Sequence, residues 1–159
     1  MSSAACTTSS ACFSVGNRIY YTTDGYAQAR AHVQRWDGKT WSVSNTGLAS
    51  SPPLNGIACR SGSACTAVGG GKRPEVAQWN GSTWLVSHFA GKASQSSLSD
   101  IDCLSATNCF AVGAFRSNAD DQPLVEHWNG SSWQTMSVPA PTSGGGGLSA
   151  VACVNADDC

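Results

Sequence analysis

Apolar and polar residues alternate over short segments of this 159-residue chain, and polar stretches separate the segments. Four such segments are rich in strand-forming residues and follow one another at residues 98–103, 109–115, 123–128 and 133–138. Asn129-Gly130 is typical of a two-residue hairpin turn, which would place Trp128 opposite Ser131 and make Trp128 and Trp133 diagonal neighbours on one face. No segment has a convincing helical period. The pattern therefore predicts a four-stranded antiparallel meander.

The same pattern occurs three times, marked by paired cysteines and paired tryptophans. Each copy opens with two cysteines separated by five residues and continues to a W-[DN]-G-x-x-W segment; a fourth cysteine pair begins a further copy. The first cysteines recur after 53, 44 and 50 residues, a period typical of propellers and other repeat arrays. The cysteines are Cys6 and Cys12, Cys59 and Cys65, Cys103 and Cys109, and Cys153 and Cys159; the tryptophans are Trp36, Trp41, Trp79, Trp84, Trp128 and Trp133.

Four-stranded units at this period predict an all-β fold: a β-propeller-type array of three four-stranded antiparallel blades plus an extra terminal strand, each blade with a hairpin disulfide. The length suits one domain, so we expect residues 1–159 to form a single array. The blades are predicted at 1–53, 54–97 and 98–147, with residues 148–159 starting a fourth repeat. We expect the six tryptophans to be structural and to pack one blade on the next; the alternative is a platform on which sugars stack.

The cysteine pairs favour disulfides in an oxidising compartment, and hence a secreted, extracellular protein. Zinc is the alternative, but zinc sites prefer two to four residues between paired cysteines and here lack the usual histidine spacing. Each disulfide would close a loop of seven residues, which chain entropy values at about 2.4 kcal/mol.

Charge is sparse and balanced, with nine Lys and Arg against ten Asp and Glu. No basic stripe exists to neutralise a phosphate backbone or an anionic lipid surface, so we expect neither nucleic acid nor membrane as a partner. No apolar run approaches the ~18 residues that a membrane-spanning helix needs.

The repeat resembles a known family. The pattern L-x-x-[IV]-x-C-x5-C-x-A-V-G, followed by L-V-E-H-W-N-G-x-S-W, is similar to a tandem repeat of secreted proteins of actinobacteria and related bacteria, which are largely uncharacterised. The resemblance covers essentially the whole chain and implies a β-propeller-like fold, but it implies no catalytic or binding residue. The D-G-K-T-W turn at residues 37–41 is also similar to the Asp-box of sialidase-like propellers, although Asp and Gly are adjacent here and separated by one residue there.

A binding site is expected at the end of the array that carries loops of varied length, because a rigid scaffold with variable loops is a common way to build one. The polar and aromatic candidates there are Tyr20, Tyr21, Tyr26, Arg30, Lys72, Arg73, Arg116, Asp120 and Asp121. Solvated loops without a ligand are the alternative. The histidines fall at unlike repeat positions and no catalytic or EF-hand pattern occurs, so we expect no catalytic residue, no metal and no cofactor.

The sequence therefore predicts a secreted binding module and not an enzyme, with lectin-like recognition of carbohydrate by the variable loops. The alternatives are a structural or protein-protein adhesion repeat that is a fragment of a larger propeller and has no small-molecule ligand, and a sialidase- or glycosidase-like enzyme. Three blades are fewer than the four to eight from which propellers close. We accordingly expect a homo-oligomer in which two chains meet head to tail and close a six-bladed ring.

Overall fold

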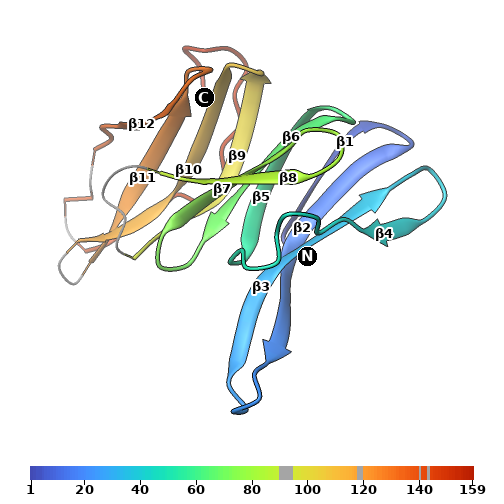
Figure 1. Cartoon of the computed structure of the whole chain (residues 1–159). Helices are drawn as coiled ribbons and strands as arrows, with labels where there is room; N and C mark the ends of the chain where they lie inside the picture. Colours follow the sequence, from blue (N-terminus) through green and yellow to red (C-terminus); the bar gives the residue numbers. More distant parts are fainter. Residues whose placement is uncertain (90–94, 118–119, 140, 143) are drawn as a thin grey trace.

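The computed structural model describes residues 1–89, 95–117, 120–139, 141–142 and 144–159, and within them the chain is all-β with three four-stranded antiparallel sheets. Strand order follows the sequence in each sheet, β1-β2-β3-β4, β5-β6-β7-β8 and β9-β10-β11-β12. The sheets stand side by side in sequence order (Figure 1). The strands are β1 (Ser3–Thr8), β2 (Ala11–Tyr21), β3 (Ala27–Trp36), β4 (Trp41–Val43), β5 (Leu54–Ser61), β6 (Ala64–Gly70), β7 (Pro74–Trp79), β8 (Trp84–His88), β9 (Ser96–Ser105), β10 (Asn108–Ser117), β11 (Asp120–Trp128) and β12 (Trp133–Met136).

The turn between the third and fourth strands differs from the prediction. In all three sheets the two tryptophans face each other directly, as Trp128 faces Trp133, so the connection has four residues and not two. The Asn129 Oδ1 atom accepts hydrogen bonds from the backbone N–H groups two and three residues later, at 2.9 Å each, and Asn80 and Asp37 do the same in the other sheets. This side-chain acceptor holds a longer turn closed, which the Asn-Gly signal alone does not reveal.

All four predicted disulfides form, at Cys6–Cys12, Cys59–Cys65, Cys103–Cys109 and Cys153–Cys159. The first three join residues that lie directly opposite each other in the first hairpin of a sheet, with Cα atoms 4.0 Å apart. Each staples the tight end of a hairpin, as predicted.

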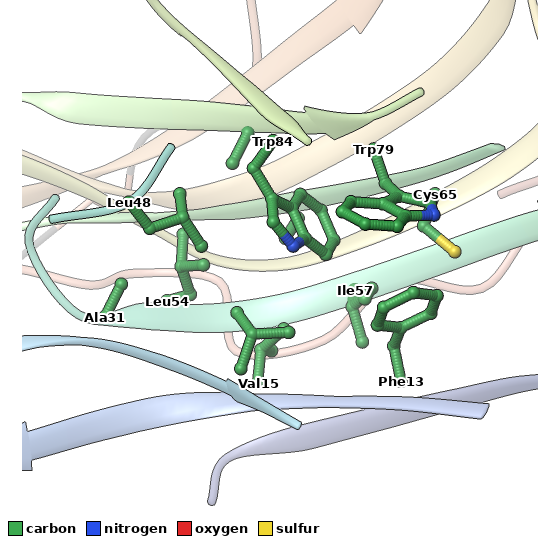
Figure 2. Close-up of a cluster of buried hydrophobic side chains, with 12 residues drawn as sticks. Phe13, Val15, Ala31, Leu48, Leu54, Ile57, Cys65, Trp79 and Trp84 are labelled. Carbon is green, nitrogen blue, oxygen red and sulfur yellow. The ribbon is translucent and has the colours of Figure 1, made fainter. Parts of the chain in front are cut away.

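The core lies between neighbouring sheets. Each sheet has a tryptophan face, which carries the Trp pair and the disulfide, and an opposite receiving face. At the first junction Trp79 and Trp84 of the second sheet pack on the receiving face of the first, where Phe13 lies 5.4 and 5.6 Å from their rings (Figure 2). Full burial of such aromatic side chains stabilises by several kcal/mol each.

A second cluster fills the junction between the second and third sheets. Val68 and Val76 of the receiving face are buried there, and Trp128 and Trp133 pack against the cluster from the third sheet. All three tryptophan pairs have the same internal geometry, with ring centroids 5.5–5.7 Å apart and interplanar angles of 41–46°. No sheet of the described residues covers the first pair, Trp36 and Trp41, and Trp41 is 46% exposed.

The extra terminal strand predicted at the start of the fourth repeat, residues 148–159, is not formed. The segment lies along β9, where Val151 N–H and Cys153 N–H donate to the carboxylates of Asp100 and Asp102 at 3.1 and 2.8 Å. A strand needs a neighbouring backbone to complete its ladder, and here side-chain carboxylates accept the hydrogen bonds instead. No helix in the described part of the chain is long and apolar enough to cross a membrane.

Candidate functional site

The hairpin of β2 and β3 projects beyond the body of the molecule and carries the predicted tyrosines (Figure 1). Tyr20 is 41% exposed, Tyr21 77% and Tyr26 74%. The tip is ordered by Thr22, whose hydroxyl accepts from Tyr26 N–H at 3.1 Å and donates to the Tyr26 carbonyl at 3.3 Å. Three aromatic rings are thus presented to solvent on a braced turn.

One face of this hairpin carries a polar and aromatic cluster. Arg18 faces Arg30 across the two strands, and Tyr20 faces Gln28. The Arg18 guanidinium lies over the Tyr20 ring, 5.4 Å from its centroid, and Arg30 Nη2 donates to Gln28 Oε1 at 3.1 Å. The two strands therefore hold planar donors and a ring in one row.

Arg30 also connects the hairpin to a hollow at the junction of the first two sheets. Its Nη1 atom donates to the Ala49 carbonyl at 2.7 Å, and Ala49 lines a cavity of about 340 Å³. We call this cavity the junction pocket; its walls are Gly47, Ala49, Ser50, Ser51, Glu75, Val86 and His88. The connector that follows β4 forms one wall, and β7 and β8 form the other.

Glu75 is the chemically distinctive residue of the junction pocket. It is 3% exposed, and its Oε1 atom is buried without a hydrogen-bond partner. Burial raises the pKa of the Glu75 carboxyl, because desolvation disfavours the charged form; a hydrogen bond from Ser51 and the charge of His88 oppose the shift. His88 Nδ1 lies 3.9 Å from Glu75 Oε2 and its side chain is 62% exposed, so a solvated imidazole stands at the rim.

The charged candidates of the second and third sheets gather at a separate place on the same end. Residue 95 joins their loops, since Gln95 N–H donates to the Lys72 carbonyl at 2.8 Å and its own carbonyl accepts from Arg116 N–H at 2.9 Å. Arg116 also pairs with Asp121 at 3.9 Å. Asp120 begins β11 beside Asp121, and Arg73 follows Lys72 in the β6–β7 turn.

The nine predicted site residues thus form two groups. Arg30 and the tyrosines belong to the projecting hairpin, where Arg30 bonds to the Ala49 carbonyl of the junction pocket. Lys72, Arg73, Arg116, Asp120 and Asp121 surround the joined loops. The predicted variable segments also include residues 90–94, 118–119, 140 and 143, which lie outside the described residues.

The sequence interpretation missed Glu75, Ser51 and His88. One signal was available: Glu75 stands four residues before Trp79, on the alternation that points into a sheet-sheet junction, where the other repeats have His32 and Leu124. A charged residue at an inward position marks an unusual environment. The approach of the 47–51 connector depends on tertiary packing, and no local pattern encodes it.

The site offers hydrogen-bonding and stacking groups more than reactive ones. One buried carboxyl and one exposed imidazole line the pocket, and within the described residues no group of three or more His, Cys, Asp or Glu side chains is placed to hold a metal ion.

Neither protein-family models nor curated protein sequences gave a match to this chain.

Proposed function

We propose that this chain is a secreted carbohydrate-binding module of propeller type, which recognises its ligand with the projecting hairpin and the adjoining junction pocket. The observation that carries the proposal is the contrast between the two classes of aromatic residue. The tryptophans of the second sheet are buried between sheets, with Trp84 2% exposed, whereas Tyr21 and Tyr26 stand in solvent at 77% and 74%. Rings this exposed on a braced turn contribute little to packing among the described residues.

Carbohydrate suits this combination of groups. Tyrosine offers an apolar face for a pyranose ring and a hydroxyl for a hydrogen bond. Arg30 and Gln28 supply planar donors and an acceptor on the Tyr20 face of the same hairpin, and His88 adds an imidazole at the rim of the junction pocket. The net charge of −1 favours neither a polyanionic nor a polycationic ligand.

The four disulfides support an oxidising environment and thus secretion. The propeller-type arrangement is supported by the consecutive four-stranded meanders, each packed face to face on the next (Figure 1).

Glycan-array screening followed by titration calorimetry tests the proposal. We expect the double variant Tyr21→Ser/Tyr26→Ser to lose about tenfold or more in affinity for a glycan that the native chain binds, since each stacked ring contributes roughly 0.5–1.5 kcal/mol. Val154→Ser is the matched control, because Val154 is an equally exposed apolar residue, at 82%, on the C-terminal segment. A chain that binds no glycan, or a double variant that binds like the native chain, would contradict the proposal.

A further inference from the structure

Within the described residues, two complementary sheet faces have no second sheet packed on them, one at each end of the array. The first sheet presents its tryptophan face with Trp36 and Trp41, and the receiving face of the third sheet, which includes the buried Phe110, has no further described sheet against it. Inside the chain, faces of these two kinds meet at both junctions. The two internal junctions therefore show what kind of face each of these two faces can pack against.

The open tryptophan face has the geometry of the buried ones. The Trp36 and Trp41 rings are 5.7 Å apart at 41°, against 5.5 Å and 46° for Trp79 and Trp84. Trp41 is 46% exposed, whereas Trp84 at the equivalent position is 2% exposed and donates through Nε1 to the Ser44 carbonyl across the junction at 2.9 Å. The first pair is thus already arranged for docking.

The open receiving face repeats the residues that accept a tryptophan pair. The first sheet uses Phe13, Val15, Ala31 and Val33, all buried in the first junction. At the same repeat positions the third sheet has Phe110, Val112, Pro123 and Val125. On this face Phe110 and Val112 are already buried, at 9% and 4% exposed, and Val125 is half-buried; His127 stacks on Phe110 with ring centroids 4.6 Å apart.

Residues 148–153 cover part of the receiving face of the third sheet. Leu148-Ser-Ala-Val-Ala-Cys153 corresponds to Leu54–Cys59 of the second repeat and to residues 1–6 of the first, so the segment stands where a docking sheet would place its first strand. It is held by Leu148 N–H to the Gly113 carbonyl and by the two bonds to Asp100 and Asp102, and it belongs to no sheet. A segment held so sparsely is displaceable.

We propose that a second copy of this chain docks the Trp36 and Trp41 face of its first sheet on the Phe110 face of the third sheet, with its β1 replacing residues 148–153. The contact is head to tail, and each chain carries both halves of it. Two such contacts join six four-stranded sheets, within the range of four to eight at which propellers close. The occupant that fits both open faces is therefore another copy of the chain.

Solution mass across a concentration series, measured by light scattering and sedimentation equilibrium, tests this inference. We expect a dimer for the native chain and monomers for Trp41→Lys and Val125→Lys, each of which places a charge in one half of the contact. Near-ultraviolet circular dichroism verifies that both variants fold. Tyr21→Lys is the matched control; it alters the projecting hairpin, so it should weaken glycan binding and leave the dimer intact, which separates failure of this inference from failure of the proposed function.

Mixing the two monomeric variants gives the decisive result. A head-to-tail contact predicts a one-to-one heterodimer, because Val125→Lys keeps a sound tryptophan face and Trp41→Lys keeps a sound receiving face. Deleting residues 148–159 should lower the dissociation constant of the dimer at least tenfold, since the receiving face of the third sheet is then uncovered. The inference is overturned if Val125→Lys alone still dimerises, which would indicate tryptophan face against tryptophan face, or if both the native and the shortened chain stay monomeric at about 0.1 mM.

Discussion

At the scale of single residues, the acceptor that opens each tryptophan turn decides how that turn responds to acid. Asp37 accepts N–H bonds from Thr40 and Lys39, and these bonds lower the pKa of its carboxyl. A lowered folded-state pKa gives a stabilisation that is present above the unfolded pKa and is lost as the pH falls through the folded pKa.

We therefore expect Asp37→Asn to remove one acid-sensitive contribution to folding. Asparagine performs the same role at Asn80 and Asn129, so the turn itself should persist. Urea midpoints between pH 2 and 7 should fall less steeply toward acid for the variant than for the native chain. Equal slopes for the two proteins would mean that the carboxylate bonds do not persist in solution.

Glu75 should act in the opposite sense. Burial raises the pKa of the Glu75 carboxyl in the folded state, so the folded state prefers the protonated form. As the pH rises from the unfolded-state pKa of about 4.5 to the raised folded-state pKa, the unfolded state loses its proton first. The Glu75 carboxyl therefore lowers the free energy of unfolding across this pH range. Glu75→Gln should become more stable relative to the native chain as the pH rises through that window. Urea unfolding at pH 4 and pH 7 measures this, and the Glu75 carboxyl resonance in NMR titration reports its pKa directly. A resonance that titrates at or below the ordinary glutamate range would contradict the prediction.

At the scale of elements, chemically identical tryptophans have unequal roles because of what covers them. Trp84 is 2% exposed and contacts Phe13, whereas Trp41 at the same position of the first repeat is 46% exposed. We expect Trp84→Ala to lower the free energy of unfolding by about 3–5 kcal/mol. Trp41→Ala should cost less than about 1 kcal/mol in dilute solution, where the chain is monomeric, as exposed substitutions usually do. Denaturant unfolding at low protein concentration compares them; equal losses would show that Trp41 is covered in solution.

The disulfides also differ in how much each is expected to stabilise the fold, depending on whether it lies within a sheet. Cys59–Cys65 closes a paired hairpin and Cys65 is 3% exposed, whereas Cys153–Cys159 closes a segment outside the sheets. Replacing Cys59 and Cys65 by alanine should cost about 2–4 kcal/mol, and replacing Cys153 and Cys159 should cost much less, because the released segment supports little other structure. Urea midpoints of the two double variants test the contrast, which fails if both shift alike.

Sequence alternation was sufficient to predict that the strands exist, since a half-buried strand needs period two and little else. It underestimated their length at the variable end, where β2 runs to Tyr21 and β3 begins at Ala27, so Tyr20, Tyr21 and Arg30 lie in strands and not in the expected loop. It could not predict the tryptophan register, because the side-chain acceptor of Asn129 makes a four-residue turn from residues that also suit a two-residue one. It wrongly predicted a strand at residues 148–153 for a related reason: their composition suits a strand, but a strand forms only beside a partner strand.

At the scale of the whole molecule, the three sheets form a nearly one-dimensional stack. Each apolar cluster lies between two consecutive repeats, so the second sheet contributes to both junctions and the outer sheets to one each. In such arrays the stability is approximately the sum of repeat and nearest-neighbour contributions. The candidate site follows from the same stacking: the 47–51 connector of the first repeat, which Arg30 contacts through the Ala49 carbonyl, and Glu75 of the second repeat lie on opposite walls of one pocket. Only the packing of the repeats brings them together, so the site could be predicted as a set of loops and not as a pocket.

The tryptophan turns also rest on the disulfide hairpins. Gly38, Gly81 and Gly130 all have positive φ, and a Cβ at Gly38 or Gly130 would lie 2.8 or 2.7 Å from a side-chain atom of Ser10 or Thr107. The indole Nε1 atoms of Trp36, Trp79 and Trp128 donate to backbone carbonyls of the same hairpins at 3.0–3.3 Å. These contacts restrict changes of length and sequence at the disulfide end of every repeat. The opposite end is free to accept insertions, which makes the chain a scaffold for grafted peptides or randomised loops: libraries built at the β2–β3 and β6–β7 turns should leave the disulfide end undisturbed.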